Sequence, residues 1–233
     1  REKEAYYRND KLDGQQTGWL ESGDISSLSF YKDGKIDGNS MSWYENGQKF
    51  REDNYKLGVR EGAYNYWNEN GVKLYEGNYK EGNLNGKFTE RYQSGKKMYE
   101  KHYKDGKEDG KETWWRENGQ IKMVYNYKNG LLHGKKIWWG ENGEKYGEGE
   151  FVLGTGKWTT RHSNGQKWKE EYWKDGKEDG KWTYWYNNGK VERKLTWING
   201  KLEGIQRSWH ANGQIKFEAI YKVGECISGD CPD

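Results

Sequence analysis

The sequence is poor in proline, cysteine and long apolar runs. Its 233 residues include one proline and two cysteines, and the mean hydropathy is −1.39. No apolar run approaches the length that spans a membrane, and no signal peptide is recognisable at the start. The chain starts at Arg1 rather than at methionine, so removal of a leader stays an open alternative. A membrane-spanning helix is therefore not expected.

An excess of either charge is also missing. The 40 basic and 37 acidic residues leave a net charge of +3, which does not indicate a nucleic-acid-binding protein. Charged residues make up 33% of the chain and aliphatic residues are scarce, a composition that by itself indicates disorder. Aromatic residues nevertheless make up 16% and recur at regular intervals, which disordered chains do not show. A folded repeat protein is expected.

What the sequence does contain is an internal repeat, seen most clearly from Tyr103 to Tyr127. One glycine of each unit, taken here as position 1, recurs every 24 residues, apart from one step of 22 residues. These glycines are Gly14, Gly38, Gly62, Gly86, Gly110, Gly134, Gly156, Gly180 and Gly204. A second glycine, at position 10 (Gly119 type), follows the same period and the same deletion. Two independent markers therefore support nine units.

Each unit carries two turn signals separated by runs rich in Trp, Tyr and Thr and free of proline, which favours strands. An Asn-Gly pair precedes the second strand of most units and predicts a two-residue hairpin loop. The Gly-x-x-x-Gly segments, such as 106–110 and 176–180, predict a longer return loop. The expected fold is all-β, an elongated antiparallel array of about nine hairpins. Residues 1–13 are expected to be a partial repeat or cap, 14–224 the repeats and 225–233 a tail, with a kink or tighter turn at 154–156.

Two aromatic columns support this fold. Position 6 holds Trp19, Trp43, Trp67, Arg91, Trp115, Trp139, Arg161, Trp185 and Trp209, and position 18 holds Tyr31, Tyr55, Tyr79, Tyr103, Tyr127, Phe151, Trp173, Trp197 and Tyr221. A two-residue Asn-Gly turn would place position 6 opposite position 13, for example Trp43 opposite Phe50, and position 18 on the other face with position 5. Equal places in stacked hairpins form ladders, so these columns are predicted to be the core. Arg91 and Arg161 are predicted to stack between the neighbouring tryptophans.

The segments 110–124 and 167–180 resemble the MORN repeat variant, a family that includes bacterial proteins labelled YwqK-like antitoxins. The resemblance covers about residues 6–224. It implies a β-hairpin meander used as a binding scaffold, with protein partners and, for related MORN repeats, membrane phosphoinositides. The antitoxin label implies a toxin partner, although no residue of this chain carries that label. The unit length and the Asn-Gly turn differ from standard MORN spacing.

No constellation of residues indicates catalysis or a cofactor. The four histidines are His102, His133, His162 and His210, and only the last two share a position, two units apart. The Asp-Gly loops alternate with lysine, which disfavours calcium. Cys226 and Cys231 either close a small disulfide loop in an oxidising compartment or remain free thiols, and they form only half of a tetrahedral metal site. We therefore expect no enzyme, no cofactor and no metal.

The expected function is a non-catalytic scaffold that binds a protein, or assembles with itself through sheet edges or the ends of the array. An alternative is glycan or cell-surface binding through the aromatic rows, or anionic-lipid binding through a lysine row. That row, at position 12, is Lys49, Lys73, Lys97, Lys145 and Lys167, and a glutamate row at position 15 is Glu52, Glu76, Glu100, Glu148, Glu170 and Glu218. A solvated face of paired charges is the simpler interpretation. Localisation stays open, with an exported location slightly favoured.

Overall fold

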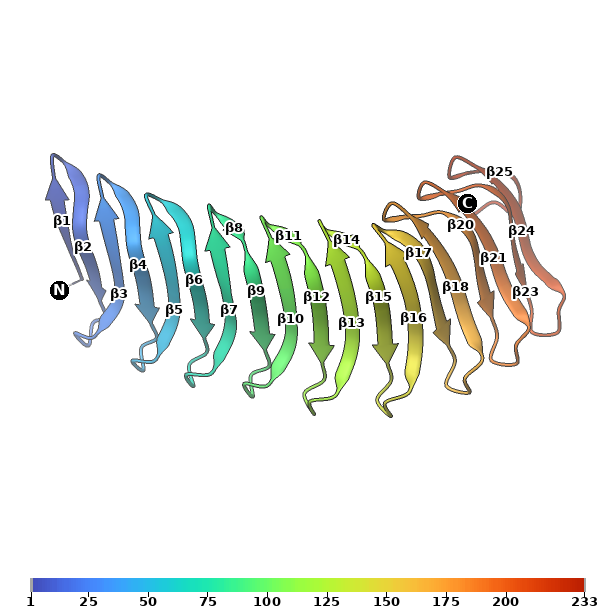
Figure 1. Cartoon of the computed structure of the whole chain (residues 1–233), viewed down its shortest axis with the longest axis horizontal. Helices are drawn as coiled ribbons and strands as arrows, with labels where there is room; N and C mark the ends of the chain where they lie inside the picture. Colours follow the sequence, from blue (N-terminus) through green and yellow to red (C-terminus); the bar gives the residue numbers. More distant parts are fainter. Residues whose placement is uncertain (1, 233) are drawn as a thin grey trace. The chain divides into compact units, whose positions relative to one another are not determined.

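The computed structural model describes residues 2–232, which form β-strands and turns without any helix. The chain divides into two compact units, Arg1–Gln120 and Ile121–Asp233. Each unit is a single-layer antiparallel sheet of consecutive hairpins (Figure 1). No helix long and apolar enough to cross a bilayer occurs among the described residues. The predicted all-β hairpin repeat is confirmed.

The first unit contains twelve strands. They are β1 (Lys3–Arg8), β2 (Lys11–Trp19), β3 (Ile25–Lys32), β4 (Lys35–Trp43), β5 (Lys49–Lys56), β6 (Val59–Trp67), β7 (Lys73–Lys80), β8 (Asn83–Leu84), β9 (Gly86–Arg91), β10 (Lys97–Lys104), β11 (Lys107–Glu108) and β12 (Gly110–Trp115).

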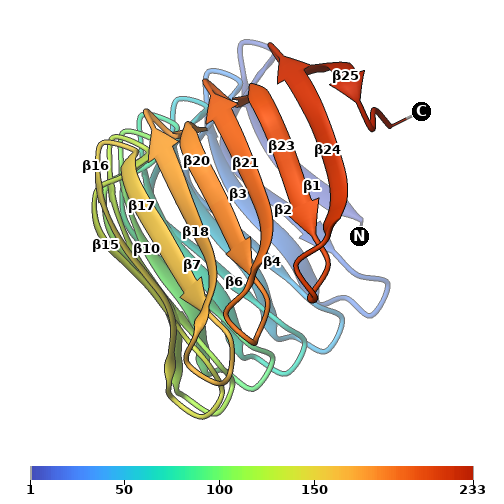
Figure 2. The same ribbon diagram turned by 90° about the vertical axis from the view of Figure 1, so that its right-hand side faces the viewer.

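The second unit contains thirteen strands. They are β13 (Ile121–Lys128), β14 (Leu131–Leu132), β15 (Gly134–Trp139), β16 (Lys145–Val152), β17 (Thr155–Arg161), β18 (Lys167–Lys174), β19 (Lys177–Glu178), β20 (Gly180–Trp185), β21 (Val191–Ile198), β22 (Lys201–Leu202), β23 (Gly204–Trp209), β24 (Ile215–Lys222) and β25 (Glu225–Gly229). Figure 2 shows β25 beside the end of β24, with which it pairs.

The two-residue turn lies at positions 20 and 21, where the sequence had predicted a longer loop. Leu57 and Gly58 have φ angles of 48° and 90°, and the flanking residues Lys56 and Val59 pair directly. Positive φ at both central residues defines the type I′ turn, whose twist matches that of the adjoining strands. The equivalent pairs in the other repeats, such as Asp105-Gly106, have the same positive φ angles.

The Asn-Gly pairs occupy a three-residue loop, so the predicted register at this end is wrong. The Tyr44 N–H donates to the Gln48 carbonyl at 2.9 Å and the Gly47 N–H donates to the Tyr44 carbonyl at 3.0 Å. Only the glycine of the pair has positive φ, 79° at Gly47, as in a type I turn followed by a glycine bulge. Trp43 is consequently paired with Lys49 rather than Phe50, with a register shift beside it.

A bulge at the position-1 glycine follows the type I′ turn in the 24-residue repeats, and the shortened repeat lacks it. Between β5 and β6 the register shifts after the pair Tyr55–Arg60, and Gly62 at the bulge has φ of 96°. β16 and β17 instead pair without a shift. The turn at Leu153-Gly154 keeps its φ angles of 47° and 80°, so the tighter turn predicted at 154–156 is wrong. The two missing residues were removed from the bulge.

Hydrogen bonds between successive turns hold neighbouring hairpins together. The N–H of Gly58 donates to the carbonyl of Ile36 at 2.7 Å, and the N–H of Leu57 donates to the Asp37 carboxylate at 3.0 Å. At the opposite end, the Tyr44 hydroxyl donates to the carbonyl of Trp67 at 2.9 Å. Both contacts recur along the repeats, so the polar residues at positions 24 and 7 connect each hairpin to the next.

Because each sheet is a single layer, few side chains are fully buried. The buried apolar residues among those described are Leu74, Phe151, Trp158, Trp182 and Ala219. Most aromatic side chains of the strands are half-buried and cover one another along the sheet. Stabilisation therefore depends on contacts between adjacent repeats, as in other repeat arrays.

Candidate binding faces of the sheet

Strand pairing assigns twelve strand positions of the repeat to one of two faces. Directly paired residues share a face, as Ser42 and Arg51 do, and alternate residues along a strand point to opposite faces. Positions 3, 5, 14, 16, 18 and 23 form one face, called here the tyrosine face. Its aromatic members include Tyr55, Tyr64, Tyr66, Tyr75, Tyr79, Tyr99 and Tyr103 in the first unit, and Tyr125, Tyr127, Trp158, Trp173, Trp182, Tyr184, Trp197 and Tyr221 in the second.

Positions 2, 4, 6, 12, 15 and 17 form the opposite face, called here the tryptophan face. It carries the position-6 residues together with the lysine and glutamate rows. Thr17, Thr89 and Thr113 at position 4 are buried beneath these longer side chains. The prediction that columns 6 and 18 lie on opposite faces, with position 5 beside column 18, agrees with the pairing.

Lysine side chains, rather than other tryptophans, cover several of the position-6 rings. The Nζ atoms of Lys49 and Lys73 lie 5.3 Å and 5.5 Å from the centre of the Trp67 ring. Neighbouring position-6 residues come from every second strand and are therefore about 9.6 Å apart, too far for rings to stack. The intervening strand contributes the position-12 lysine, which fills the space. Position-12 lysines thus cover the rings of Trp67, Trp115 and Trp185, whereas an aliphatic residue occupies position 12 in four repeats (Ile25, Ile121, Val191 and Ile215).

The two arginines of column 6 make polar contacts. Arg91 Nη2 lies 2.7 Å from Glu76 Oε1, and Arg161 Nη1 donates to the carbonyl of Gly165 at 3.1 Å. Burial opposes ionisation of Glu76, but the hydrogen bond and charge of Arg91 outweigh it and lower the pKa of this carboxyl. Because the strands on either side of Arg91 contribute Lys73 and Lys97 to this face, the predicted stack of Arg91 between Trp67 and Trp115 is replaced by an ion pair.

Glutamates neutralise the lysine row of the tryptophan face. The Nζ–Oε2 distances run from 2.8 to 3.4 Å in the five pairs Lys49–Glu52, Lys73–Glu76, Lys97–Glu100, Lys145–Glu148 and Lys167–Glu170. The Lys97 and Lys167 contacts lower the pKa of Glu100 and Glu170 against the opposing effect of burial. The row therefore presents paired charges, as the simpler interpretation of the sequence expected.

The tyrosine face of the first unit carries a continuous series of ring contacts. These join Tyr44–Phe50 (4.9 Å between centroids), Phe50–Tyr66 (4.7 Å), Tyr66–Tyr75 (5.5 Å), Tyr75–Phe88 (6.4 Å), Phe88–Tyr99 (5.9 Å) and Tyr99–Trp114 (4.5 Å). Positions 3, 5 and 14 supply most of these rings, which the two columns singled out from the sequence did not include. Alternation from the position-18 column would have identified positions 14 and 16.

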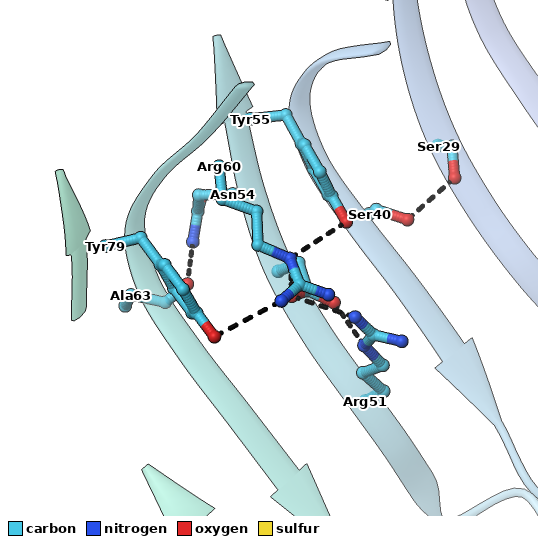
Figure 3. A network of polar contacts seen from close by, with 9 residues as sticks. Ser29, Ser40, Arg51, Asn54, Tyr55, Arg60, Ala63 and Tyr79 are labelled. Atoms are coloured by element: carbon cyan, nitrogen blue, oxygen red, sulfur yellow. Dashed lines mark hydrogen bonds and ion pairs between the residues drawn. The ribbon is translucent and has the colours of Figure 1, made fainter. Parts of the chain in front are cut away.

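A buried carboxylate organises charged side chains on the same face. Asp53 is 3% exposed and pairs with Arg51 and, at 3.6 Å, with Arg60. Arg60 also donates to the hydroxyls of Tyr55 (3.5 Å) and Tyr79 (3.2 Å), as Figure 3 shows. The hydrogen bond to Tyr55 raises the pKa of Arg60 despite its partial burial. The network holds a guanidinium between two column-18 tyrosines.

A second buried carboxylate lies further along this unit. Glu112 is 3% exposed, accepts a hydrogen bond from Trp114 Nε1 and lies 3.5 Å from Lys101 Nζ. Burial raises the pKa of Glu112. Lys101 also pairs with Glu108 at 2.9 Å. Within residues 2–232, Oε2 of Glu112 is buried without a hydrogen-bond partner.

In the second unit, indoles replace many of the tyrosines. Trp182 lies between Trp173 and Trp197, with ring centroids 5.4 Å and 5.5 Å away. The column-18 rings Trp173 and Trp197 do not contact each other directly. The position-3 ring of Trp182 lies between them and completes the ladder. Buried Glu171 pairs with Lys169 at 2.7 Å on the same face.

Three of the four histidines, His102, His133 and His162, form hydrogen bonds through their side chains. His162 Nε2 lies 2.7 Å from the carbonyl of Trp185, where Tyr44 and Tyr186 use a hydroxyl in the equivalent contact. His102 contacts a backbone carbonyl, and His133 accepts from a turn N–H. Among the described residues, no group of three or more His, Cys, Asp or Glu is placed to hold a metal ion.

The cysteines lie at the end of the second unit. The sulfurs of Cys226 and Cys231 are bonded in the structure, with their Cα atoms 5.6 Å apart. Cys226 belongs to β25 and pairs with Tyr221, and Asp230 exchanges hydrogen bonds with Glu218 through its backbone N–H and its carboxylate. The loop thus keeps β25 against the second half of β24.

Five segments match the family model described as MORN repeat variant: residues 36–57, 84–105, 108–129, 178–199 and 202–222. Each begins at position 23 and ends at position 19 or 20. The matched unit is therefore one hairpin built around the three-residue loop and bounded by type I′ turns. No curated protein matches the chain.

Two solved structures illustrate the structural neighbours. A crystal structure of TcdB2-TccC3-Cdc42 has 9% identity and a TM-score of 0.25, over 91% of this chain and 13% of that chain. A Photorhabdus luminescens Tc holotoxin pore has 10% identity and a TM-score of 0.18, over 91% of this chain and 15% of that one. The chain thus spans a small part of these proteins, and TM-scores of this size do not establish a common fold.

Proposed function

We propose that the chain is a non-catalytic MORN-type scaffold that binds a protein partner through the tyrosine face. The observation that carries this proposal is the composition of that face, which carries half-buried Tyr and Trp rings and places tyrosine rings beside Arg51, Arg60 and Arg193. Tyr, Trp and Arg are the residues enriched in the cores and hot spots of protein interfaces. The five MORN-variant segments support a binding role, since MORN repeats mediate protein or membrane interactions.

An antitoxin-like role is a narrower form of this proposal, in which the partner is a toxin. Self-association through sheet edges is another form, because within residues 2–232 β1 pairs on one side only, with β2, and the free edge of a strand can pair with another chain. Sedimentation velocity over a range of concentrations separates these forms. A monomer at all concentrations that forms a complex with a second protein supports heterologous binding.

Glycan binding through the tryptophan face is less well supported. Lysines lie over the Trp67 ring from both neighbouring strands, and Lys97 and Lys167 lie over the rings of Trp115 and Trp185. A sugar would have to displace these side chains to stack on the indoles. The same lysines are paired with glutamates, which also disfavours attraction to anionic lipid.

Site-specific photo-crosslinking in the source cells tests which face binds. A benzophenone amino acid is introduced at Tyr79 on the tyrosine face or, as a matched control one residue away on the opposite face, at Asn78. We expect a discrete crosslinked partner from position 79 and none from position 78. Crosslinking from position 78 alone, in a variant that melts like the wild type, would contradict the proposal.

A further inference from the structure

The shortened repeat leaves a hollow on the tyrosine face of the second unit. In the full-length repeats, position 23 places a side chain beside the column-18 ring with which it pairs. These side chains are Ile36, Arg60, Leu84, Glu108, Leu132, Glu178, Leu202 and Cys226. The β16–β17 hairpin has lost positions 23 and 24, and Thr155 is followed directly by Gly156. The row is therefore interrupted between Leu132 and Glu178.

Aromatic and aliphatic side chains line this interruption. The hollow has a volume of about 290 Å³, and its lining includes Tyr127, Leu132, Phe151, Trp173 and Lys136. Phe151 is 2% exposed and contributes an apolar wall. A volume of this size lies at the lower limit of small-molecule pockets, so the hollow suits a small group.

Lys136 is held at the hollow by an unusual arrangement on the neighbouring strands. Its Nζ lies 4.3 Å from the centre of the Trp158 ring and 5.4 Å from that of Tyr125. The indole lies against Gly147 and Gly149, where an added Cβ would come within 2.6 Å and 3.1 Å of ring atoms. Two glycines on β16 therefore make the room in which the indole supports the lysine.

The charge of Lys136 is not balanced by an acid of its own. The buried carboxylate nearby is Glu171, which pairs with Lys169 at 2.7 Å. Among residues 2–232, no carboxylate lies within 4.0 Å of Lys136 Nζ. Burial lowers the pKa of Lys136, while the charge of Glu171 acts in the opposite direction. Two ammonium groups thus share one carboxylate beside an apolar hollow.

We propose that this hollow binds a small aryl carboxylic acid, with its carboxylate at Lys136 Nζ and its aryl group against Phe151 and Trp173. A carboxylate supplies the missing negative charge and accepts charge-assisted hydrogen bonds from the ammonium group. An aryl group replaces the absent position-23 side chain. The site does not depend on the function proposed above.

Phenylacetate is the probe for calorimetric titration and tryptophan fluorescence. We expect saturable binding to the wild type, and binding at least tenfold weaker in Lys136→Met. Lys157→Met removes an exposed lysine from the opposite face and is expected to leave binding unchanged. Phenylethylamine, which has the ring but a cation, is expected not to bind. Absence of saturable phenylacetate binding, or equal affinity in Lys136→Met, would overturn the proposal.

A second variant tests the hollow without changing the lysine. Insertion of Leu-Asp between Thr155 and Gly156 restores the 24-residue period and places a leucine at position 23, so binding is expected to be lost. Retained binding in a folded insertion variant would show that the hollow is not the site. The tripeptide Gly-Gly-Phe and its amide identify the source of the carboxylate: binding of the free acid but not the amide indicates a peptide C-terminus, and binding of phenylacetate alone indicates a free acid.

Discussion

Arg91 shows how the position-6 column accommodates a residue other than tryptophan. Arg91 replaces tryptophan and pairs with Glu76, and the side chains are 24% and 31% exposed. A pair of this exposure contributes about 0.5–1 kcal/mol. We therefore expect a double-mutant cycle of Arg91→Ala and Glu76→Gln, measured by urea unfolding, to give a coupling energy in this range. The pair Lys145–Glu148 is 48% and 52% exposed and is the control, with coupling near zero. Equal coupling in both cycles would contradict this interpretation.

Glu112 makes stability depend on pH. Burial raises its pKa in the folded state, so its stabilising contribution is fully present below the unfolded value and is lost as pH rises through the folded value. We expect the free energy of unfolding of wild type minus that of Glu112→Gln to decrease as pH rises above about 4.5. Contributions from Glu76 and Glu100, whose pKa values are lowered, cancel in this difference. A difference that stayed constant or increased over this pH range would contradict a raised pKa of Glu112.

At the scale of the hairpin, the type I′ turn makes one residue unfavourable. Leu57 adopts φ of 48°, a conformation that costs a branched side chain about 1–2 kcal/mol and that asparagine tolerates better. Leu57→Asn is therefore expected to increase the free energy of unfolding by about 1 kcal/mol in urea titrations. Val59→Asn changes an exposed strand residue two positions away and is expected to be neutral or destabilising. Destabilisation by Leu57→Asn would mean that the turn is not of this type.

The sequence predicts the hairpins well and their turns poorly, for a physical reason. Period, strand composition and glycine spacing all favour consecutive antiparallel hairpins. An Asn-Gly pair, however, can form a two-residue type I′ turn or the last two residues of a three-residue loop, as at Asn46-Gly47. The turn propensities of Asn and Gly do not distinguish these two loops. The better indication of a two-residue turn is the pair of lysines that flank Asp105-Gly106. These lysines pair directly, which leaves only two residues for the loop.

The faces were predictable, but their contacts were not. Alternation places columns 6 and 18 on opposite sides, whereas a one-residue bulge decides whether Trp43 lies opposite Lys49 or Phe50. The hollow at Lys136 could not be predicted from the sequence, because it results from the absence of the position-23 side chain in one repeat. The two-residue deletion is visible in the sequence, where it predicts a kink or a tighter turn at 154–156 instead of the missing bulge that the pairing of β16 with β17 shows.

At the scale of the whole molecule, the repeat distributes nearly equal charge in rows. The net charge is +3, and each lysine of the position-12 row has a glutamate three residues away. Such rows present little net attraction to a negative surface, whose field decays within about 10 Å at ordinary salt. The balance of the rows, and not the number of lysines, decides whether a membrane attracts this protein.

Cosedimentation with phosphatidylserine vesicles tests this conclusion. We expect the wild type to remain in the supernatant at 0.15 M salt, roughly physiological ionic strength. The triple variant Glu52→Gln, Glu76→Gln and Glu100→Gln frees three lysines of one row, each contributing about 1 kcal/mol near an anionic surface, and is expected to pellet with the vesicles at low salt. Neutral phosphatidylcholine vesicles are the control and should retain neither protein. If the wild type pelleted as strongly as the triple variant, the glutamate row would not neutralise the lysines, and lipid binding through the tryptophan face would become the better account of this surface.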